Sequence, residues 1–369
     1  MEIYDIAVVG AGPAGCMAAI MGAKKGKKVI ILERNNEIGR KLLLTANGRC
    51  NITNAASLDI FLEKFGDGGS FYRDALIRFN NEDLINFFRS YGLEFKEEED
   101  GRIFPVTDKA KSVVNILKKA LEDPNIKKLY NFRLKHLYKH SKLFKLTSME
   151  GREIKSFNVV LATGGASYKN TGSTGDGFNI AKSLGHHITE LKPGGVPLMI
   201  KEKWIHELKG ITLKNVGLKL QSGRKIKILP QGNVLFTHFG ISGPVVLDMS
   251  HEIIEIMEKY GDLKLYIDFA ADMKEQDLET LLINDFQNYS KQSLKNYLRR
   301  YMPKNIVKPV LNTVSLDPDK NLNQISKKER FHLQNLIKSF PLTVNNYLPL
   351  NNAMVTCGGV IKKEINPRV

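Results

Sequence analysis

Residues 10–15, which read GAGPAG, constrain the fold more than any other feature of the chain. They follow an apolar run, Ile3 to Val9, that is rich in β-branched residues and predicts a buried strand. Apolar residues then recur at helical spacing over 16–21, and the basic run 24–28, with a glycine inside it, ends this helix. Val29 to Leu32 predicts a second buried strand. The chain therefore opens as strand, turn, helix and strand, with a right-handed crossover.

This turn has the spacing G-x-G-x-x-G, and it lies between a predicted strand and a predicted helix, as a dinucleotide-binding turn requires. Gly10 permits the tight bend, Gly12 lets a pyrophosphate approach the backbone, and Gly15 allows the helix to pack close to the strand. The helix N-terminus adds free N–H donors and a positive dipole end. Glu33 ends the second strand, where its carboxylate can accept hydrogen bonds from an adenosine ribose. The segment predicts a dinucleotide-binding unit.

A third apolar strand, Val159 to Leu161, runs into Ala162-Thr163-Gly164-Gly165 and resembles the "ATG" strand of two-dinucleotide-binding flavoproteins. No second G-x-G-x-x-G follows a strand, so the sequence predicts one dinucleotide site. One such unit together with this strand favours a resident FAD over NAD. A second site for NAD(P)H, acting as a transient reductant, stays open.

Composition excludes several classes of protein. The 369 residues suggest two or three domains. Three cysteines without a C-x-x-C pair provide neither a disulfide framework nor a zinc or other metal site, which favours a cytoplasmic location. The uncharged run 6–23 contains glycines and a proline at its middle and follows acidic residues, so no targeting or membrane-spanning segment is expected.

The net charge of +16 has two readings. Residues 291–340 hold eleven Lys or Arg against three Asp or Glu, about half of the excess. A solvated basic face of a lysine-rich protein explains this charge, and so does attraction for nucleic acid, an anionic substrate or an acidic partner.

The remaining patterns predict a coarse order of elements. A polar, glycine-rich loop covers 35–54 and a β region with turns at Ser222-Gly223 and Gln231-Gly232 covers 194–270. The helical patterns lie at 71–91, 110–121, 178–184 and 273–339, the last with a break at Pro303. Strand-like patterns lie at 127–147, with an end near residue 156, and at 344–365.

Four segments together resemble one family. Residues 39–54 read GRKLLLTANGRCNITN, and three further segments agree: TGSTGDG at 171–177, VLFTHFGISGP at 234–244 and AMVTCGGV at 353–360. The chain is identified by these motifs as similar, over almost its whole length, to the aminoacetone oxidase or BaiN-like (HI0933-like) family of three-domain FAD-binding bacterial flavoproteins.

The resemblance implies an α/β fold with a Rossmann-type FAD-binding domain, an inserted β domain over the flavin and an additional α-helical domain. The FAD-binding domain would cover 1–192 plus 345–369. The β domain would cover 193–272 plus about 335–344, and the helical domain would cover 273–334. Members of the family continue beyond the point that matches Pro367 with a further strand and helix, so a chain without that segment is expected to retain flavin more weakly.

The implied function is FAD-dependent oxidoreduction, with a hydride equivalent passing between flavin and a small organic molecule such as the amine aminoacetone. Two alternatives stand beside it. One is NAD(P)H-dependent reduction of an activated double bond, and the other is a redox-silent relative that binds nucleic acid. The oligomeric state is left open.

The site residues follow from the motifs and the resemblance. The expected cofactor-binding residues are Gly10, Gly12, Pro13, Ala14, Gly15, Glu33, Arg34, Lys41, Asn47, Gly48, Arg49, Cys50, Asn51, Leu134, Ala162, Thr163, Gly164 and Gly165. Lys41 or Arg49 is expected to balance the charge of the pyrophosphate or of the reduced flavin. Cys50 is read as a small packed residue rather than a redox thiol, because no partner cysteine lies nearby in the sequence.

The β domain and two loops supply the remaining candidates. His238 is expected either to orient substrate and move a proton or to be a structural histidine, and Tyr168 is a second catalytic candidate. Thr237 and Ser242 are expected to contact substrate. The loop 172–177 is expected to bind an anion or the flavin edge, or else Asp176 is a simple helix N-cap.

Overall fold

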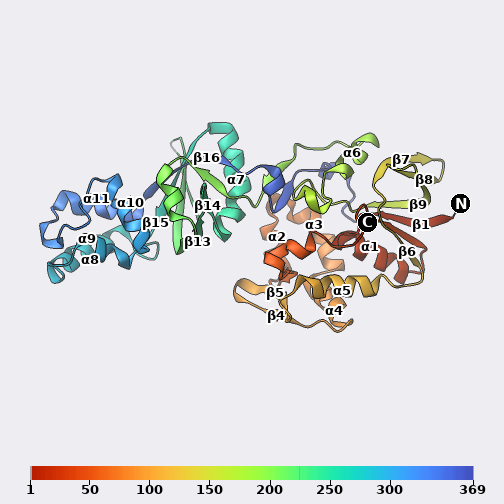
Figure 1. Cartoon of the computed structure of the whole chain (residues 1–369), viewed down its shortest axis with the longest axis horizontal. Coiled ribbons are helices and arrows are strands. Elements are labelled where there is room, and N and C mark those ends of the chain that lie inside the picture. Colours follow the sequence, from red (N-terminus) through yellow and green to blue (C-terminus); the bar gives the residue numbers. More distant parts are fainter. Residues whose placement is uncertain (1, 224, 369) are drawn as a thin grey trace. The chain divides into compact units, whose positions relative to one another are not determined.

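The computed structural model describes residues 2–223 and 225–368, and at residue 67 the backbone alone. The chain forms two compact units, Met1–Leu191 with Gly358–Val369, and Lys192–Cys357 (Figure 1). No helix in these ranges combines the length and the apolar character that crossing a bilayer requires.

A six-stranded sheet is the centre of the first unit. Its strands are, in spatial order, β6 (Ile126–Leu129), β2 (Val29–Leu32), β1 (Ile3–Val9), β9 (Glu153–Leu161), β8 (Leu143–Ser148) and β7 (Leu134–His140). β1 pairs in parallel with β2 and β9, as does β2 with β6, whereas β7, β8 and β9 pair antiparallel. The predicted strand at 159–161 is therefore the end of a longer strand.

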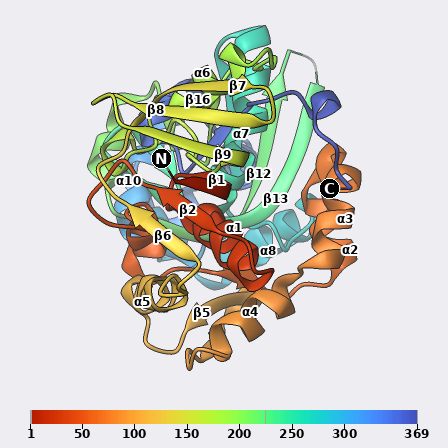
Figure 2. The ribbon, with the colours of Figure 1, turned by 90° about the vertical axis from the view of Figure 1, so that its right-hand side faces the viewer.

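The opening unit is confirmed at both strands. Between them lies α1 (Pro13–Lys24), which buries small side chains against the sheet, in view below β1 and β2 in Figure 2. A Cβ at Gly22 would lie 3.1 Å from side-chain atoms of Ile6 and Val29, which shows how close this packing is. Met21, although at helical spacing, is 41% exposed.

The other elements of the first unit are short. The helices are α2 (Leu58–Lys64), α3 (Gly69–Arg78), α4 (Asn81–Arg89), α5 (Ala110–Ala120) and α6 (Asp176–Ser183), and a small sheet has the order β3 (Thr53–Asn54), β5 (Arg102–Pro105) and β4 (Phe95–Glu97). The predicted helix at 71–91 is two helices, because Asn80 and Asp83 form a capping box that begins α4. The predicted loop at 35–54 holds β3 and a 3₁₀ segment, Leu42–Gly48.

A closed barrel is the main feature of the second unit. Its strands are, in spatial order, β11 (Leu198–Ile200), β14 (Gly240–Ser242), β13 (Lys225–Phe236), β12 (Thr212–Ser222), β15 (Leu263–Asp268) and β16 (Phe340–Tyr347). β10 (Lys192–Gly194) pairs antiparallel with β17 (Val355–Cys357). The turn after Ser222 is confirmed by the pairing of Ser222 with Lys225.

The turn expected at Gln231-Gly232 is wrong, because β13 continues through both residues. A Cβ at Gly232 would lie 3.0 Å from Cβ of Val245 in α7 (Pro244–Tyr260). Gly232 therefore lets a helix pack closely on the strand. The sequence analysis missed α7, which interrupts the β region.

Residues 273–339 are mostly helical, as predicted. The helices are α8 (Glu275–Asn288), α9 (Leu294–Tyr297), α10 (Lys304–Thr313) and α11 (Lys327–Lys338), and Pro303 caps the start of α10. Their buried residues form one hydrophobic cluster with the barrel interior, for example Leu282 and Phe286 with Leu265 and Phe340. The division into three domains stays a prediction, while residues 345–357, expected with the FAD domain, group with the barrel unit.

Candidate functional site: a pocket at the strand ends

A cavity of about 460 Å³ lies in the first unit, where β1, β2 and β9 end. These strands are parallel, so their carboxyl ends meet at one edge of the sheet, the usual binding edge of such a fold. The lining residues include Gly10, Gly12, Pro13, Ala14, Glu33, Arg34, Lys41, Leu134, Ala162, Thr163 and Gly164, all of them predicted.

The glycines of the turn are required for different reasons. Gly10 has a φ of 101°, and a Cβ at Gly15 would lie 1.9 Å from the Gly10 carbonyl oxygen. A Cβ at Gly12 would meet nothing within 4 Å, although Gly12 lines the cavity and caps α1. No contact with the described residues explains a glycine there. A ligand that approaches the backbone at the helix N-terminus does, and a pyrophosphate fits this role.

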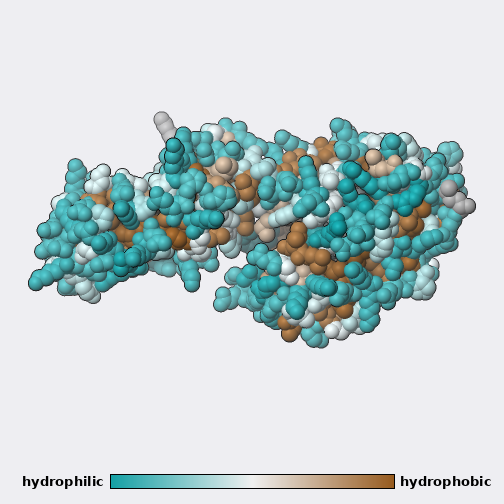
Figure 3. Space-filling model, in the orientation of Figure 1, coloured by the Kyte–Doolittle hydropathy of each residue, from teal (hydrophilic) through white to brown (hydrophobic). Residues whose placement is uncertain are grey.

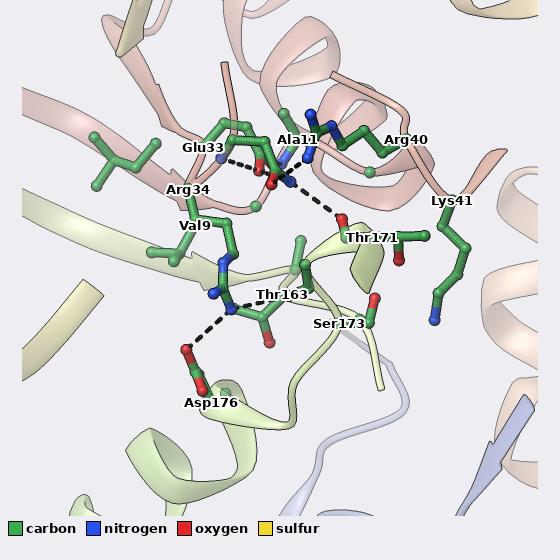
Figure 4. Close-up of a pocket in the computed structure, with 18 of the residues that line it drawn as sticks. Val9, Ala11, Glu33, Arg34, Arg40, Lys41, Thr163, Thr171, Ser173 and Asp176 are labelled. Atoms are coloured by element: carbon green, nitrogen blue, oxygen red, sulfur yellow. Dashed lines mark hydrogen bonds and ion pairs between the residues drawn. The ribbon is translucent and has the colours of Figure 1, made fainter. Parts of the chain in front are cut away.

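Glu33 is buried beside the glycine turn 10–15, and its carboxylate accepts three hydrogen bonds from described residues (Figure 4). Ala11 N–H donates to Oε2 at 2.7 Å, and the backbone and side-chain amides of Asn35 donate to Oε1, each at 2.8 Å. These donors fix the carboxylate at the cavity wall. Oε1 uses both of its lone pairs in these bonds, whereas Oε2 keeps a second lone pair, which is the acceptor that a ribose hydroxyl needs.

Two arginines hold the loop 171–176 against the cavity. Arg34 Nη1 donates to Thr174 Oγ1 at 2.7 Å and lies 3.4 Å from Asp176 Oδ2, while Arg133 Nε donates to Asp176 Oδ2 at 2.9 Å. Gly175, not Asp176, is the N-cap of α6, so the expectation of a simple cap is wrong. Burial acts to raise the pKa of Asp176, but the bonds from Arg133 and Thr174 outweigh it and lower this pKa.

We expect Asp176→Asn to lower the free energy of unfolding by about 1 kcal/mol at pH 7, a modest value because the arginines are partly exposed. Since the folded-state pKa is lowered, the carboxylate stabilises the fold above its unfolded-state pKa. This contribution is lost as the pH falls through the folded-state pKa. Urea unfolding of both proteins at several pH values should show the difference vanish in acid. Glu63→Gln, at an exposed carboxylate that pairs with no cation among the described residues, should show no such difference. A pH-independent gap for Asp176→Asn would contradict the prediction.

The two predicted cations differ in their surroundings. Lys41 lines the cavity, the only hydrogen bond of its ammonium in the described chain is to Ser167 Oγ at 3.3 Å, and burial lowers its pKa. Arg49 pairs with Glu98 and Asp108 and lies 4.1 Å from the Phe104 ring centroid, away from the cavity. Of these two cations, Lys41 is therefore the one available to an anionic ligand in the cavity.

Comparison with known proteins shows to which family the chain belongs. The family model described as the HI0933-like protein Rossmann domain matches residues 4–369. The chain belongs to this family. The resemblance and the fold class predicted from the motifs are thereby confirmed, and the chain is an FAD-dependent oxidoreductase.

Curated members of the HI0933-like family match the chain over nearly its full length. It is 29% identical over 365 residues to a 3-dehydro-bile acid delta(4,6)-reductase of Clostridium scindens, covering 98% of this chain and 88% of the relative. It is 28% identical over 374 residues to a ribosomal RNA dihydrouridine synthase of Escherichia coli, covering 100% of this chain and 88% of the relative. Among solved structures, a flavocytochrome c3 fumarate reductase aligns with a TM-score of 0.45 and 15% identity, over 97% of this chain and 67% of that one.

The family loop 45–51 does not line the cavity, and neither do Gly15 and Gly165. Cys50 is buried and burial raises the pKa of its thiol, which agrees with a packed residue. The Asn51 amide donates to the carbonyl oxygens of Ile103 and Thr53 and so joins β3 to β5. Asn47 and Gly48 adopt positive φ values of 55° and 86° in the same tight turn.

Ala46 has a φ of 47° in this turn, a conformation that disfavours side chains. We expect Ala46→Gly to raise the free energy of unfolding by about 0.5 kcal/mol. Relief of about 1–2 kcal/mol of left-handed strain exceeds the added backbone entropy of about 0.5–1 kcal/mol. Urea unfolding measures this change. Ala75→Gly, inside α3, is the control and should destabilise by about 1 kcal/mol; equal losses in both variants would contradict the prediction.

Four predicted residues lie elsewhere. Tyr168 is half-buried with a φ of 52°, and its carbonyl oxygen accepts from Thr171 N–H at 2.9 Å. In the second unit, the exposed His238 packs edge-on to Phe239, and the Thr237 hydroxyl accepts from Gly240 N–H at 3.1 Å. Ser242 ends β14.

Several cavity residues were missed by the sequence analysis. They are Asn35, Arg40, Phe132, Arg133 and Thr171, whereas Ser173 belongs to the loop 172–177 that was predicted. Phe132 N–H donates to the Glu33 carbonyl oxygen at 2.9 Å, so the chain before β7 is held beside the end of β2. The proximity of this segment to Leu134, which was predicted, is the signal that could have indicated Phe132 and Arg133.

Proposed function

We propose that this chain reduces an activated carbon–carbon double bond of its substrate with electrons that originate from NAD(P)H. The observation that carries the proposal is the full-length similarity to two relatives whose names both denote double-bond reduction. Dihydrouridine is uridine with one ring double bond reduced, and a delta(4,6)-reductase acts on ring double bonds of a steroid. The two relatives differ in substrate, so the similarity supports the reaction type and not one substrate.

The cavity supports a specific arrangement of FAD. We assign the pyrophosphate to Gly12, Pro13 and Ala14, whose backbone lines the cavity at the start of α1. Glu33 accepts from the ribose, and Leu134, beside Phe132, contacts the adenine. Ala162, Thr163 and Gly164 follow β9 and line the cavity wall that would hold the flavin part of the cofactor.

The remaining predicted residues have supporting roles. Lys41 compensates negative charge on the cofactor, Arg34 holds the loop 171–176, and the left-handed turn with Asn47, Gly48 and Cys50 shapes the backbone next to Lys41. Arg49 and Asn51 act through this turn by fixing it to neighbouring strands.

FAD, when bound, supplies the two-electron chemistry by accepting a hydride equivalent and returning it to one carbon of the double bond. The other carbon requires a proton, which a side chain or water must donate. We propose His238 for this role, with Tyr168 as the second candidate and with Thr237 and Ser242 as substrate contacts. The His238 side chain is exposed, so a substrate can reach it.

Anaerobic spectroscopy of the purified holoenzyme tests the reaction. NADH or NADPH should bleach the flavin absorbance, and 2-cyclohexen-1-one or a uridine-containing RNA should restore it without oxygen. Aminoacetone tests the alternative of amine oxidation. If aminoacetone bleaches the oxidised flavin and no unsaturated compound restores it, the proposal is wrong and the chain is an amine oxidase.

The proton donor is tested by the pH profile of reoxidation. His238→Gln should slow reoxidation by the unsaturated compound and remove one ionisation from the profile, while leaving bleaching by NAD(P)H unchanged. An unaltered profile would assign the proton to Tyr168 or to water.

A further inference from the structure

The helical segment 273–339 carries positive charge that its own carboxylates do not neutralise. Hydrophilic residues cover most of its face in Figure 3. Lys295, Lys320, Arg300 and Lys338 form ion pairs. In the described part of the chain, no carboxylate pairs with the other basic residues between 291 and 340: Lys291, Arg299, Lys304, Lys308, Lys327, Lys328 and Arg330.

A shallow hollow of about 480 Å³ lies where α8 ends. Its lining residues are Asn288, Tyr289, Ser290, Lys291, Gln292 and Arg300, and none is acidic. The Arg300 guanidinium lies 4.5 Å from the ring centroid of Tyr289, which is 45% exposed, and Nη1 donates to Asp285 Oδ2 at 2.8 Å. Asp285 therefore fixes the arginine beside an accessible aromatic ring, among amide side chains.

A second hollow lies on α11 and has a similar composition. Lys327, Lys328, Arg330 and Phe331 line it together with Gln334 and Glu279. Phe331 is 57% exposed, unusual for a phenylalanine in a charged surface. Lys327 and Lys328 precede it by four and three residues, so all three side chains share one face of the helix.

We propose that this helical segment binds single-stranded RNA, with Tyr289 and Phe331 as stacking platforms for unpaired bases. Cations beside an exposed ring are the combination that binds single strands, because the cations contact phosphates while the ring stacks on a base. Asn288 and Gln292 offer amides to base edges. Bases of a duplex are already stacked and cannot use the rings.

The inference rests on the proposed function and narrows its substrate. Uracil, a base of RNA, contains a C5=C6 double bond conjugated to the C4 carbonyl, which is the activated double bond that the reaction requires. The helical segment would hold the strand from which such a base is presented for reduction.

Fluorescence anisotropy of the holoenzyme with a labelled 20-nucleotide oligouridine, between 50 and 200 mM KCl, tests the surface. Lys327→Ala/Lys328→Ala/Arg330→Ala should weaken binding at least 10-fold and reduce the slope of log Kd against log salt by about 2, as expected for three lost phosphate contacts. Tyr289→Ala/Phe331→Ala should weaken binding at least 10-fold with the slope unchanged.

Lys111→Ala/Lys118→Ala/Lys119→Ala on α5 removes the same charge from another exposed helix and should change the affinity less than twofold. Equal losses in the two triple variants, or duplex RNA bound as tightly as the single strand, would overturn the proposal. Reduction of 2-cyclohexen-1-one separates the two hypotheses. If it proceeds while RNA does not bind, only this inference fails; if RNA binds through the surface but no double bond is reduced, only the proposed function fails.

Discussion

Gly12→Ala is expected to weaken FAD binding by about 10- to 100-fold while leaving the free energy of unfolding of the apoprotein within about 1 kcal/mol. The cavity has room for the new methyl group when no ligand is present, because a Cβ there meets nothing within 4 Å. The methyl group then occupies space that the pyrophosphate needs, and overpacking of this kind costs about 1–3 kcal/mol. Titration of the apoprotein with FAD, followed by flavin fluorescence, gives the dissociation constant.

Gly15→Ala is the matched control three residues further along. Its Cβ would lie 1.9 Å from the Gly10 carbonyl oxygen, so the apoprotein itself should lose stability, by about 3 kcal/mol or more. Urea unfolding separates the two effects. If Gly12→Ala binds FAD as tightly as the wild type, the pyrophosphate does not lie across this turn and the assignment of the cavity is wrong.

Lys338→Met is expected to lower the free energy of unfolding of the barrel unit by about 3–5 kcal/mol. Lys338 and Asp268 form an ion pair at 2.7 Å with 8% of each side chain exposed. The ammonium also donates to the carbonyl oxygens of Ala270 and Met273, at 2.9 and 2.7 Å. The substitution leaves the buried Asp268 carboxylate without its cationic partner, with only the Ala270 N–H still donating to it in the described structure.

Two comparisons test this explanation. Asp268→Asn in addition to Lys338→Met removes the unpaired charge and should restore more than 1 kcal/mol. Lys295→Met breaks an exposed pair with Asp319 and should cost less than about 1 kcal/mol. If the double variant is no more stable than Lys338→Met, the loss reflects packing and not an isolated charge.

The sequence predicted elements whose determinants are local. The first strand, its helix and the second strand were correct because period, turn glycines and basic helix end agree over 30 neighbouring residues. The 17-residue helix α7 was missed, although Pro244 begins it. Gly232 was taken for a turn because its role, close contact with Val245, depends on a helix that follows it in the chain.

The residues of the candidate site, too, were predicted correctly only where their positions depend on local sequence. The residues of the glycine turn, Glu33 and the stretch after β9 line the cavity as expected, because strand ends place them there. Arg49 does not, since Glu98 and Asp108, 49 and 59 residues away, hold it elsewhere. Asp176 is positioned by arginines distant in sequence, a pairing that no local pattern contains.

The pairing of Lys192 with Cys357 has a consequence for how the protein is made. The first and last strands of the barrel unit pair with each other, so the 166 residues of this unit interrupt the first unit with their two ends adjacent. On the ribosome, the barrel is complete before residues 358–368 emerge to join the domain that began first. The first unit therefore gains its contacts with residues 358–368 only after the whole barrel unit has emerged.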